Sequence, residues 1–290
     1  RTPLHIGSGQ ESGITDATVV RYLNGQPYVP GSSFKGVFRS TVERLTEALG
    51  YSSCYLEEGR ADCLTTNRDL ANAFGLVCEA IGRVITGNEQ ERVQALQSLE
   101  VANWAGRQKI EDEQLTELLN HYLCDVCKTF GSPFAASKVL VEDLRLVGAN
   151  QPTNRWTDIR DGVGIDRDTG TAREKVKFDF EAVPMEHRFN LRMTVENADI
   201  APNDRSTVLA LVALGLNEFM KGMRLGGMTS RGLGWCQLEN VQARFLDYQN
   251  GTPQERLNLL LTRDITQITP ETGEEFVAHW LKCAAEVKEG

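Results

Sequence analysis

The chain has 290 residues with a formal net charge of -9, and 41% of its residues are hydrophobic. This apolar share, together with 26 glycines, is typical of globular proteins and excludes disordered, collagen-like and mucin-like chains. The longest apolar run, Val208 to Leu216, is far shorter than the roughly 20 residues that span a bilayer. We therefore expect a soluble protein without a membrane partner.

The charge and the cysteines narrow the class further. A pI near 5.1 disfavours a free-standing nucleic-acid binder, whose pI usually exceeds about 9. The acidity is uneven, because residues 55–125 contain 13 acidic and 6 basic side chains, so the rest of the chain can present basic surfaces. Seven cysteines, an odd number, favour reduced thiols or a metal site over a secreted disulfide framework. We expect a cytoplasmic protein.

The first fifty residues predict a hairpin followed by a helix. Asn24-Gly25 lies between two short apolar runs, which predicts a hairpin over residues 19–29. Pro30-Gly31 ends the second strand, and Ser32 or Ser33 can cap a helix of about four turns. Residues 51–127 are mostly helical in pattern but irregular, and we interpret them as an insertion.

The second half of the chain contains both strand and helix patterns. Strand residues return at 139–147, and a polar loop rich in glycine, arginine and aspartate is expected at 155–172. Two alternating runs, 176–182 and 189–195, predict a second hairpin. The other expected elements are an apolar helix at 204–222, a glycine-rich loop at 226–234, a strand at 235–245, and helices near 253–262 and 271–288. This order predicts an α+β, ferredoxin-like (RRM-like) fold around an inserted middle.

The start of the first helix is a candidate anion site. The segment Ser32-Ser33-Phe34-Lys35-Gly36 offers backbone amides, the positive end of the helix dipole, two hydroxyls and a lysine, and Arg39 follows one turn later. The competing interpretation is an ordinary capped helix with an exposed lysine. The glycine-rich loop lets a ligand approach the backbone closely, and Arg231 supplies a charge there.

Four cysteines form a candidate zinc site. Cys124 and Cys127 are a C-x2-C pair, and Cys54 with Cys63 could complete a tetrahedral thiolate set, with His121 or Cys78 as substitutes. A thioredoxin-like redox pair should follow a strand in a βαβ unit, and that context is missing. Unliganded core cysteines are the other alternative. We interpret Cys236 and Cys283 as packing residues.

Carboxylates are the best candidates for catalysis. The four histidines are scattered, and the chain contains no G-x-S-x-G elbow, P-loop or H-E-x-x-H motif. Asp16 lies in a polar stretch just before a strand, where it could reach a ligand or merely cap a turn. Asp161, Asp166 and Asp168 are interleaved with Arg160 and Arg167 in the expected loop. These residues by themselves point only to an RNA- or phosphate-binding protein.

The combination resembles the RAMP-superfamily backbone subunit of type III CRISPR RNA-guided effector complexes. The resemblance rests on four stretches in order: Leu4 to Gly9, Pro27 to Gly36 with Arg39, Asp158 to Ala172, and Arg231 to Gly234. It implies a palm at 1–50 and 129–250 with a β-hairpin thumb near 156–184, a helical, zinc-bearing insertion at 51–128 and C-terminal helices at 251–290. It also implies a filament-like assembly with other effector subunits, a guide CRISPR RNA and a complementary target RNA.

The resemblance assigns roles to individual residues. Asp16 stands where the catalytic aspartate of the family precedes a Val-Ile-Arg-like strand, although Ala17-Thr18 replaces the common Asn-Pro. Asp161 and Asp166 are the substitutes, and Mg2+ or another divalent metal would assist cleavage. The implied RNA-binding residues are Ser32, Ser33, Lys35, Arg39, Arg160, Arg167, Gly227, Arg231 and Gly232.

Three functions follow as hypotheses. The chain is a target-RNA-cleaving backbone subunit, a structural subunit that holds guide RNA without cutting, or an endonuclease that trims guide precursors. The third usually needs a histidine or tyrosine in a convincing motif, and no histidine here has one. Replacement of Asp16 by alanine would separate the first two.

Overall fold

The computed structural model describes residues 1–9, 15–57, 63–68, 71, 116, 119–148, 156–198, 206–246, 252–262 and 268–285. Within these ranges no helix is both long and apolar enough to cross a membrane. The chain divides into two compact units, each built from separate stretches of sequence. Unit 1 contains Arg1–Val19, Arg155–Glu186 and Val212–Gly290, and unit 2 contains Val20–Asn154 and His187–Leu211.

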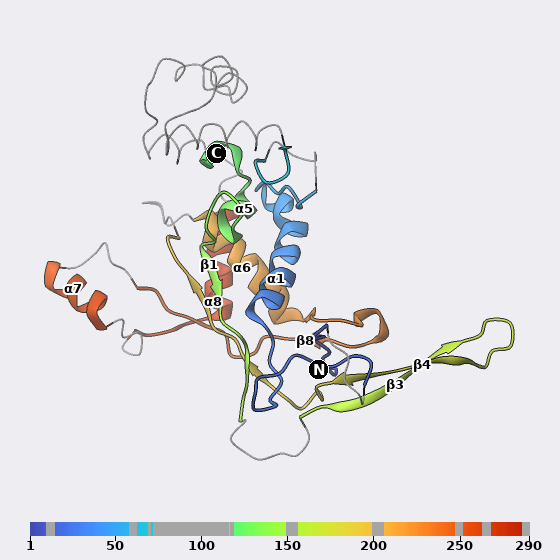
Figure 1. Cartoon of the computed structure of the whole chain (residues 1–290). Coiled ribbons are helices and arrows are strands. Elements are labelled where there is room, and N and C mark those ends of the chain that lie inside the picture. The colour runs from blue at the N-terminus through green and yellow to red at the C-terminus, as the bar shows by residue number, and fades with distance from the viewer. Residues whose placement is uncertain are drawn as a thin grey trace, which may run out of the picture. The chain divides into compact units, whose positions relative to one another are not determined.

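The helices of the described residues match most of the expected ones (Figure 1). They are α1 (Gly31–Thr46), α5 (Asp125–Phe130), α6 (Thr207–Lys221), α7 (Pro253–Thr262) and α8 (Gly273–Ala285), with short 3-10 helices η1 (Glu47–Leu49) and η3 (Thr229–Arg231). The predictions near 204–222, 253–262 and 271–288 and the helix after Pro30 are confirmed. Most of the predicted insertion, including Cys78, lies outside the described residues.

The named strands of the described residues form two-stranded antiparallel sheets, so the chain is a mixed α/β protein. The pairs are β1 (Val139–Val141) with β6 (Met193–Val195), β2 (Arg145–Leu146) with β5 (Phe189–Asn190), β3 (Asp158–Ile165) with β4 (Ala172–Ala182), β7 (Met223–Arg224) with β8 (Trp235–Cys236), and β9 (Gln242–Ala243) with β10 (Glu271–Thr272). The hairpin turn at Asn24-Gly25 is present, because the N–H of Gly25 donates to the carbonyl of Tyr22 at 2.9 Å.

The core of unit 2 is built on one face of α1. Phe34, Phe38 and Val42 recur at helical spacing and are almost fully buried, and α1 packs on α5 and β1. The rings of Phe38 and Phe130 lie 5.9 Å apart. Burial of each such side chain stabilises the fold by about 1.5–3 kcal/mol, so this face fastens α1 to the segment that carries the C-x2-C pair.

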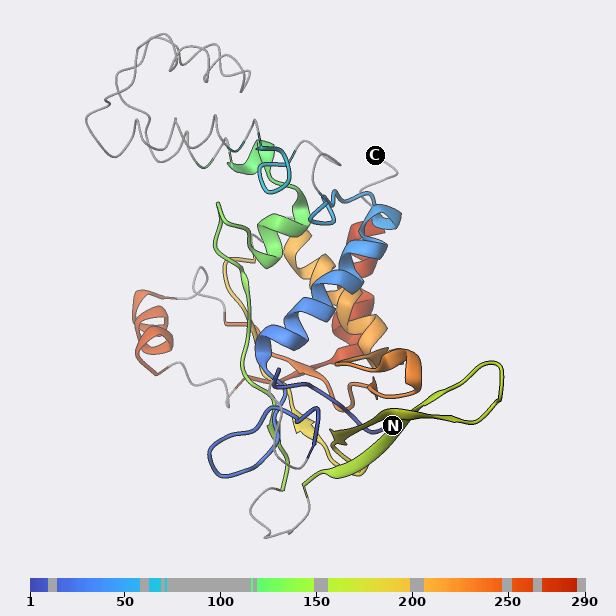
Figure 2. The same ribbon diagram turned by 45° about the vertical axis from the view of Figure 1, so that its right-hand side comes forward.

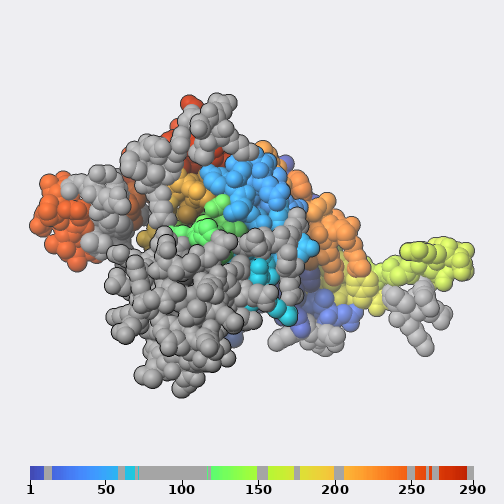
Figure 3. Space-filling model, turned by 90° about the horizontal axis from the view of Figure 1, so that it is seen from above, coloured from blue at the N-terminus to red at the C-terminus, as the bar shows by residue number. Residues whose placement is uncertain are grey.

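The predicted polar loop at 155–172 is wrong over residues 158–165, because Asp158–Ile165 is strand β3 of a long hairpin with β4. The apolar side chains of Ile159, Val163 and Ile165 on this strand are at least half exposed, and the yellow-green hairpin atoms are open to solvent in Figure 3. A strand with both faces in solvent lacks the alternation of buried and exposed residues by which strands are recognised.

The predicted second hairpin is also wrong in its pairing. Both runs contain strands, but β4 pairs with β3, whereas β5 and β6 pair with β2 and β1. Alternation marks a strand without naming its partner. The strand expected at 235–245 is interrupted between β8 and β9, where Asn240 adopts a positive φ of 55°.

The base of the β3–β4 hairpin is anchored within unit 1. Leu4 pairs with Val183 and Ala17 pairs with Phe180, so two stretches near the N-terminus lie along β4. Phe180, Ala182 and Leu233 form a buried cluster there. Figure 2 shows the orange loop around η3 beside the base of the yellow-green hairpin. The N-terminal segment, the hairpin and the glycine-rich loop therefore meet at one place.

Candidate functional site

Asp16 lies at this hairpin base with an exposed side chain. Its Oδ2 accepts a hydrogen bond from the backbone N–H of Asp179 at 2.8 Å. The next residue is held in the same way, since the N–H of Ala17 donates to the carbonyl of Asp179 and the carbonyl of Ala17 accepts from the N–H of Glu181. The Asp16 carboxylate is thus exposed beside β4, in a segment that is hydrogen-bonded to that strand.

Charged side chains line the neighbouring part of the hairpin. Lys177 Nζ lies 3.3 Å from Asp161 Oδ2 and 3.7 Å from Asp179 Oδ1. Lys177 and Asp161 are 60% exposed, so their ion pair contributes at most about 1 kcal/mol. Asp161, a predicted catalytic substitute, is therefore partnered by a lysine, and the hairpin base carries carboxylates with one cation between two of them.

Asp166, the other substitute, caps the turn of the hairpin. Its Oδ1 accepts from the backbone N–H groups of Asp168 and Thr169 and from the Thr169 hydroxyl. The backbone hydrogen bonds from Thr169 and Asp168 lower the pKa of Asp166. This is the ordinary work of a turn aspartate. Arg160 lies on β3 and Arg167 lies in the same turn as Asp166, and both are exposed.

The start of α1 differs from the expectation in one respect. Pro30 is the N-cap and no side chain caps the helix, so the expected capping by Ser32 or Ser33 is wrong. The N–H of Gly31 donates instead to Asp143 Oδ1 at 2.9 Å. A carboxylate at a helix N-terminus stabilises the helix dipole, and Ser32 is left exposed on the first turn.

Lys35 projects from the second turn of α1 and donates from Nζ to the Ser137 hydroxyl at 2.7 Å. Burial, followed by the positive charge of Arg39, lowers the pKa of Lys35. Both effects disfavour the ammonium and would be offset by a bound anion. The phosphate contact expected for Lys35 stays a prediction.

The glycine-rich loop is held against the N-terminal segment and the hairpin. Gly226 has a φ of 83°, and a Cβ there would lie 2.3 Å from the carbonyl oxygen of His5, so only glycine fits. The N–H of Gly227 donates to the same oxygen at 2.8 Å. Arg231 lies with its guanidinium 5.0 Å from the centre of the Phe178 ring, and Gly232 closes η3.

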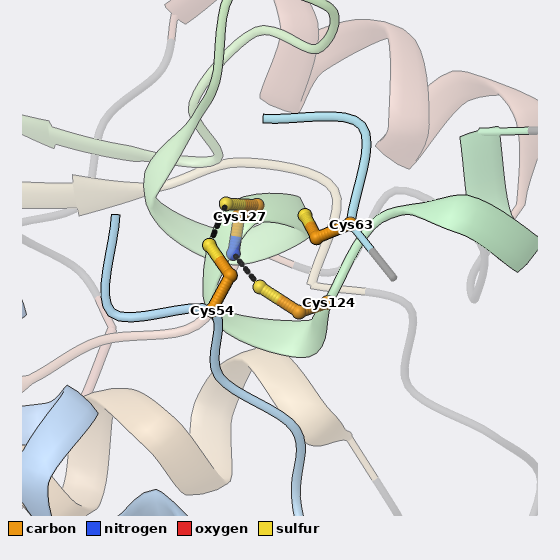
Figure 4. Close-up of side chains that lie close together, drawn as sticks. All are labelled: Cys54, Cys63, Cys124 and Cys127. Carbon is orange, nitrogen blue, oxygen red and sulfur yellow. Dashed lines mark hydrogen bonds between the residues drawn. The ribbon is translucent and has the colours of Figure 1, made fainter. Parts of the chain in front are cut away.

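The four predicted zinc ligands come together (Figure 4). Cys54 and Cys63 lie in loops, whereas Cys124 is the N-cap of α5 and Cys127 lies within it. All four are buried, their Sγ atoms lie within 4.8 Å of one another, and no disulfide joins them. His121, the substitute ligand, is not part of this group. The cluster could hold a metal ion such as zinc.

The chemistry of the cluster fits zinc. Four sulfurs each about 2.3 Å from a tetrahedral zinc ion lie about 3.8 Å apart, and the Cys54 and Cys127 sulfurs are 3.6 Å apart. The mutual hydrogen bonds of the four side chains lower the pKa of Cys63 and Cys127 and raise the pKa of Cys54 and Cys124, so they keep only part of the set as thiolates until a metal ion is bound. Thiolates are the form that binds zinc.

Sequence reasoning missed several residues at the hairpin base. Lys177, Asp179 and Glu181 were not singled out, although they alternate with the apolar residues of the run 176–182 and must share the opposite face of the strand. The Glu181 side chain accepts from the N–H of Val19 at 3.0 Å. His5 was also missed, and its Nδ1 donates to the carbonyl of Glu181 at 2.6 Å.

Comparison with known proteins identifies the family. No curated protein matches the sequence. The model of the RAMP superfamily matches residues 1–237, a range that contains Asp16, α1, the cysteine cluster, the β3–β4 hairpin and the glycine-rich loop. The chain therefore belongs to the RAMP superfamily and is a CRISPR-associated effector subunit that binds RNA.

Proposed function

We propose that the chain is a guide-RNA-binding backbone subunit of a type III CRISPR effector complex that cleaves complementary target RNA. The observation that carries this proposal is the place of Asp16, an exposed carboxylate held at the base of a long, solvent-exposed hairpin by the N–H of Asp179. In the proposed complex the β3–β4 hairpin is the thumb that interrupts the guide–target duplex. The cleaved phosphate then lies near Asp16.

The proposed chemistry follows from the geometry of RNA. Attack by an internal 2'-hydroxyl requires this oxygen to be in line with the scissile phosphate, and a stacked A-form duplex prevents that alignment. A hairpin that displaces one nucleotide supplies it, and Asp16 orients the hydroxyl and accepts its proton. The 2'-oxygen then bonds to phosphorus to give a 2',3'-cyclic phosphate, while the bond from phosphorus to the 5'-oxygen breaks and this oxygen takes a proton from water. A divalent cation such as Mg2+, for which carboxylate oxygens are suitable ligands, would offset the phosphate charge.

Guide RNA binding is assigned to the other segments. We place Lys35 and the exposed Ser32 against the guide backbone, because a partly buried ammonium beside Arg39 gains from a phosphate partner. The exposed cations Arg160 and Arg167 suit the thumb, and Arg231, with Gly227 and Gly232, suits the glycine-rich loop. In this proposal residues 1–50 and 129–250 form a ferredoxin-like palm, residues 51–128 an insertion closed by zinc, and residues 251–290 a helical end.

The test is the cleavage of a complementary RNA by the assembled complex carrying Asp16→Ala or Asp16→Asn. Both variants are expected to lower the cleavage rate by two or more orders of magnitude while target binding stays within about tenfold. Asp16→Asn is the sharper variant, because an amide oxygen still accepts from the N–H of Asp179 but cannot take a proton. Asp168→Asn, on the exposed turn, is the control and should cut normally.

A structural subunit that holds guide RNA without cutting is the second candidate. It is favoured by the hydrogen bond from Asp179, since an aspartate that only fastens its loop would make the same contact, and by Ala17-Thr18 after Asp16. A wild-type complex that binds target RNA and does not cut it supports this function. If the wild type cuts and both Asp16 variants cut at its rate, Asp161 and Asp166 are the next residues to replace.

A further inference from the structure

The side chain of Arg39 reaches from α1 to the cysteine cluster within unit 2. Its Nη2 donates to Cys127 Sγ at 3.3 Å, and its Nη1 donates to the carbonyl of Gly131, just after α5, at 2.8 Å. Its Nε pairs with Glu43 one turn further along α1 at 2.9 Å. The guanidinium therefore links α1 to both the sulfur cluster and the end of α5.

The contact has the character of a built interaction. The Arg39 and Glu43 side chains are only 15% and 9% exposed, and Cys127 is fully buried. A second donor, the Thr65 hydroxyl, lies 3.3 Å from the same sulfur. Two polar donors converge on Cys127 Sγ, an arrangement that stabilises a thiolate more than a thiol.

Charge explains why a cation belongs at this place. Four thiolates around a divalent zinc ion carry a net charge of -2, and burial makes such a charge costly unless it is compensated. Charge-assisted N–H donors to a thiolate supply this compensation, and they orient the ligand as well. Arg39 is placed to do both for Cys127, while Glu43 keeps the guanidinium oriented.

We propose that Arg39 is an outer-sphere residue of the cysteine metal centre, where it donates to the Cys127 thiolate and ties α1 to the loaded centre. This inference rests on the zinc site proposed above. It also gives Arg39 a role other than the phosphate contact that the sequence suggested, because its three donor nitrogens Nε, Nη1 and Nη2 each have a protein acceptor. Loading of the centre then steadies the helix that presents Lys35.

The test compares Arg39→Gln and Arg39→Lys with Arg44→Gln in the full chain. Arg44 is on the same helix and exposed, and it bonds only Ser40 and Thr41 among the contacts described. Competition with a chromophoric chelator measures zinc affinity. Outer-sphere changes typically cost 10–100-fold in metal affinity, so Arg39→Gln should weaken zinc binding by about that factor. Arg39→Lys should weaken zinc binding less than Arg39→Gln does, and the zinc affinity of Arg44→Gln should stay within about twofold of that of the wild type.

Cobalt(II) substitution supplies a readout that a general loss of stability does not move. Loss of an N–H donor raises the energy of the thiolate electrons, so the sulfur-to-cobalt charge-transfer band of Arg39→Gln should shift to lower energy, while that of Arg44→Gln stays in place. Arg39→Lys keeps the positive charge and one donor group, so its charge-transfer band should lie between those of the wild type and Arg39→Gln. This variant keeps the test decisive if Arg39→Gln fails to fold.

The contrary outcomes are distinct. Equal zinc affinity and an unchanged cobalt spectrum in Arg39→Gln and Arg39→Lys overturn the role of Arg39 alone. Wild-type chain that binds no zinc overturns the metal centre itself and leaves the RNA-cleavage proposal standing. Unchanged zinc binding together with a reduced salt dependence of RNA binding in Arg39→Gln would make Arg39 a phosphate contact instead.

Discussion

At the scale of single residues, Lys35 is the cation of α1 that we propose to contact the guide backbone. Its replacement by alanine should weaken guide-RNA binding regardless of RNA sequence, because a phosphate contact releases counterions rather than reading bases. Loss of one contact should reduce the slope of log affinity against log salt by about 0.7 for single-stranded RNA. Filter binding across a salt series measures the slope.

The control for Lys35 is Lys282→Ala. Lys282 is exposed on α8 and lies beyond the range that matches the family model, so its loss should leave the slope unchanged. A slope in Lys35→Ala equal to that of the wild type would mean that Lys35 serves α1 only through its bond to Ser137.

At the scale of elements, the β3–β4 hairpin depends on a close approach at Gly162. A Cβ at this position would lie 2.2 Å from the Phe178 ring, and this ring also receives the Arg231 guanidinium. Gly162→Ala should therefore displace the ring and lower the free energy of unfolding by about 1–3 kcal/mol, as overpacking does. Denaturant unfolding of Gly162→Ala, of Phe178→Ala and of the variant that carries both changes measures the coupling between the two positions.

The expected sign of this coupling is specific. In the Phe178→Ala background Gly162→Ala should lower the free energy of unfolding only slightly, because the ring atoms that its Cβ would meet are gone. The effects of the two changes on this free energy should therefore deviate clearly from additivity.

The control is Gly36→Ala, on α1, where nothing lies within 4 Å of the added Cβ. It should raise the free energy of unfolding by about 0.5–1 kcal/mol. Additive costs for Gly162→Ala and Phe178→Ala would show that the ring adapts without strain.

The helix α5 depends on the cysteine cluster in a different way. Six residues are too few for a stable isolated helix, and Cys124 and Cys127 belong to both α5 and the cluster. Their joint replacement by serine should remove the bound zinc, about one ion per chain, and lower the thermal midpoint, since metal binding is coupled to folding. Elemental analysis and a melting curve measure the two effects.

Cys236 and Cys283 provide the matched control for that change. Both are half-buried and lie in β8 and α8, outside the cluster, so their joint replacement by serine should retain the zinc. Wild-type chain purified without chelator and found free of zinc would contradict the metal site. The buried cysteines would then be packing residues.

At the scale of the whole molecule, an acidic chain is expected to bind RNA through local cations. The formal charge of -9 is concentrated in residues 55–125, where acids exceed bases by 13 to 6. Electrostatic attraction to phosphate is screened beyond a Debye length of about 8 Å at physiological salt. The attraction of phosphate to Lys35 and Arg231 therefore depends on the charges near each of them and not on the net charge of the chain. We propose that the acidic insertion faces protein subunits rather than RNA.

Helices and the cysteine group could be predicted from the sequence because their signals are local. The apolar periodicity of Phe34, Phe38 and Val42 reports a helix wherever its partner lies, and C-x2-C spacing limits the chemistry of the thiols. The β3–β4 pairing was not recognised from its residues, because the alternation in residues 176–182 marks β4 as a strand without naming its partner. The resemblance supplied the hairpin that the pattern did not.

The sequence by itself determined the family, the mixed α/β class, the helices and the residues that can act as ligands or bases, because these properties depend on neighbours along the chain. Only the tertiary structure decided that Asp143 rather than a serine meets the start of α1, that Arg39 reaches Cys127, and that Asp179 holds Asp16. Each of these contacts joins residues 88 or more positions apart. Packing selects such partners through burial and charge compensation that no local pattern encodes.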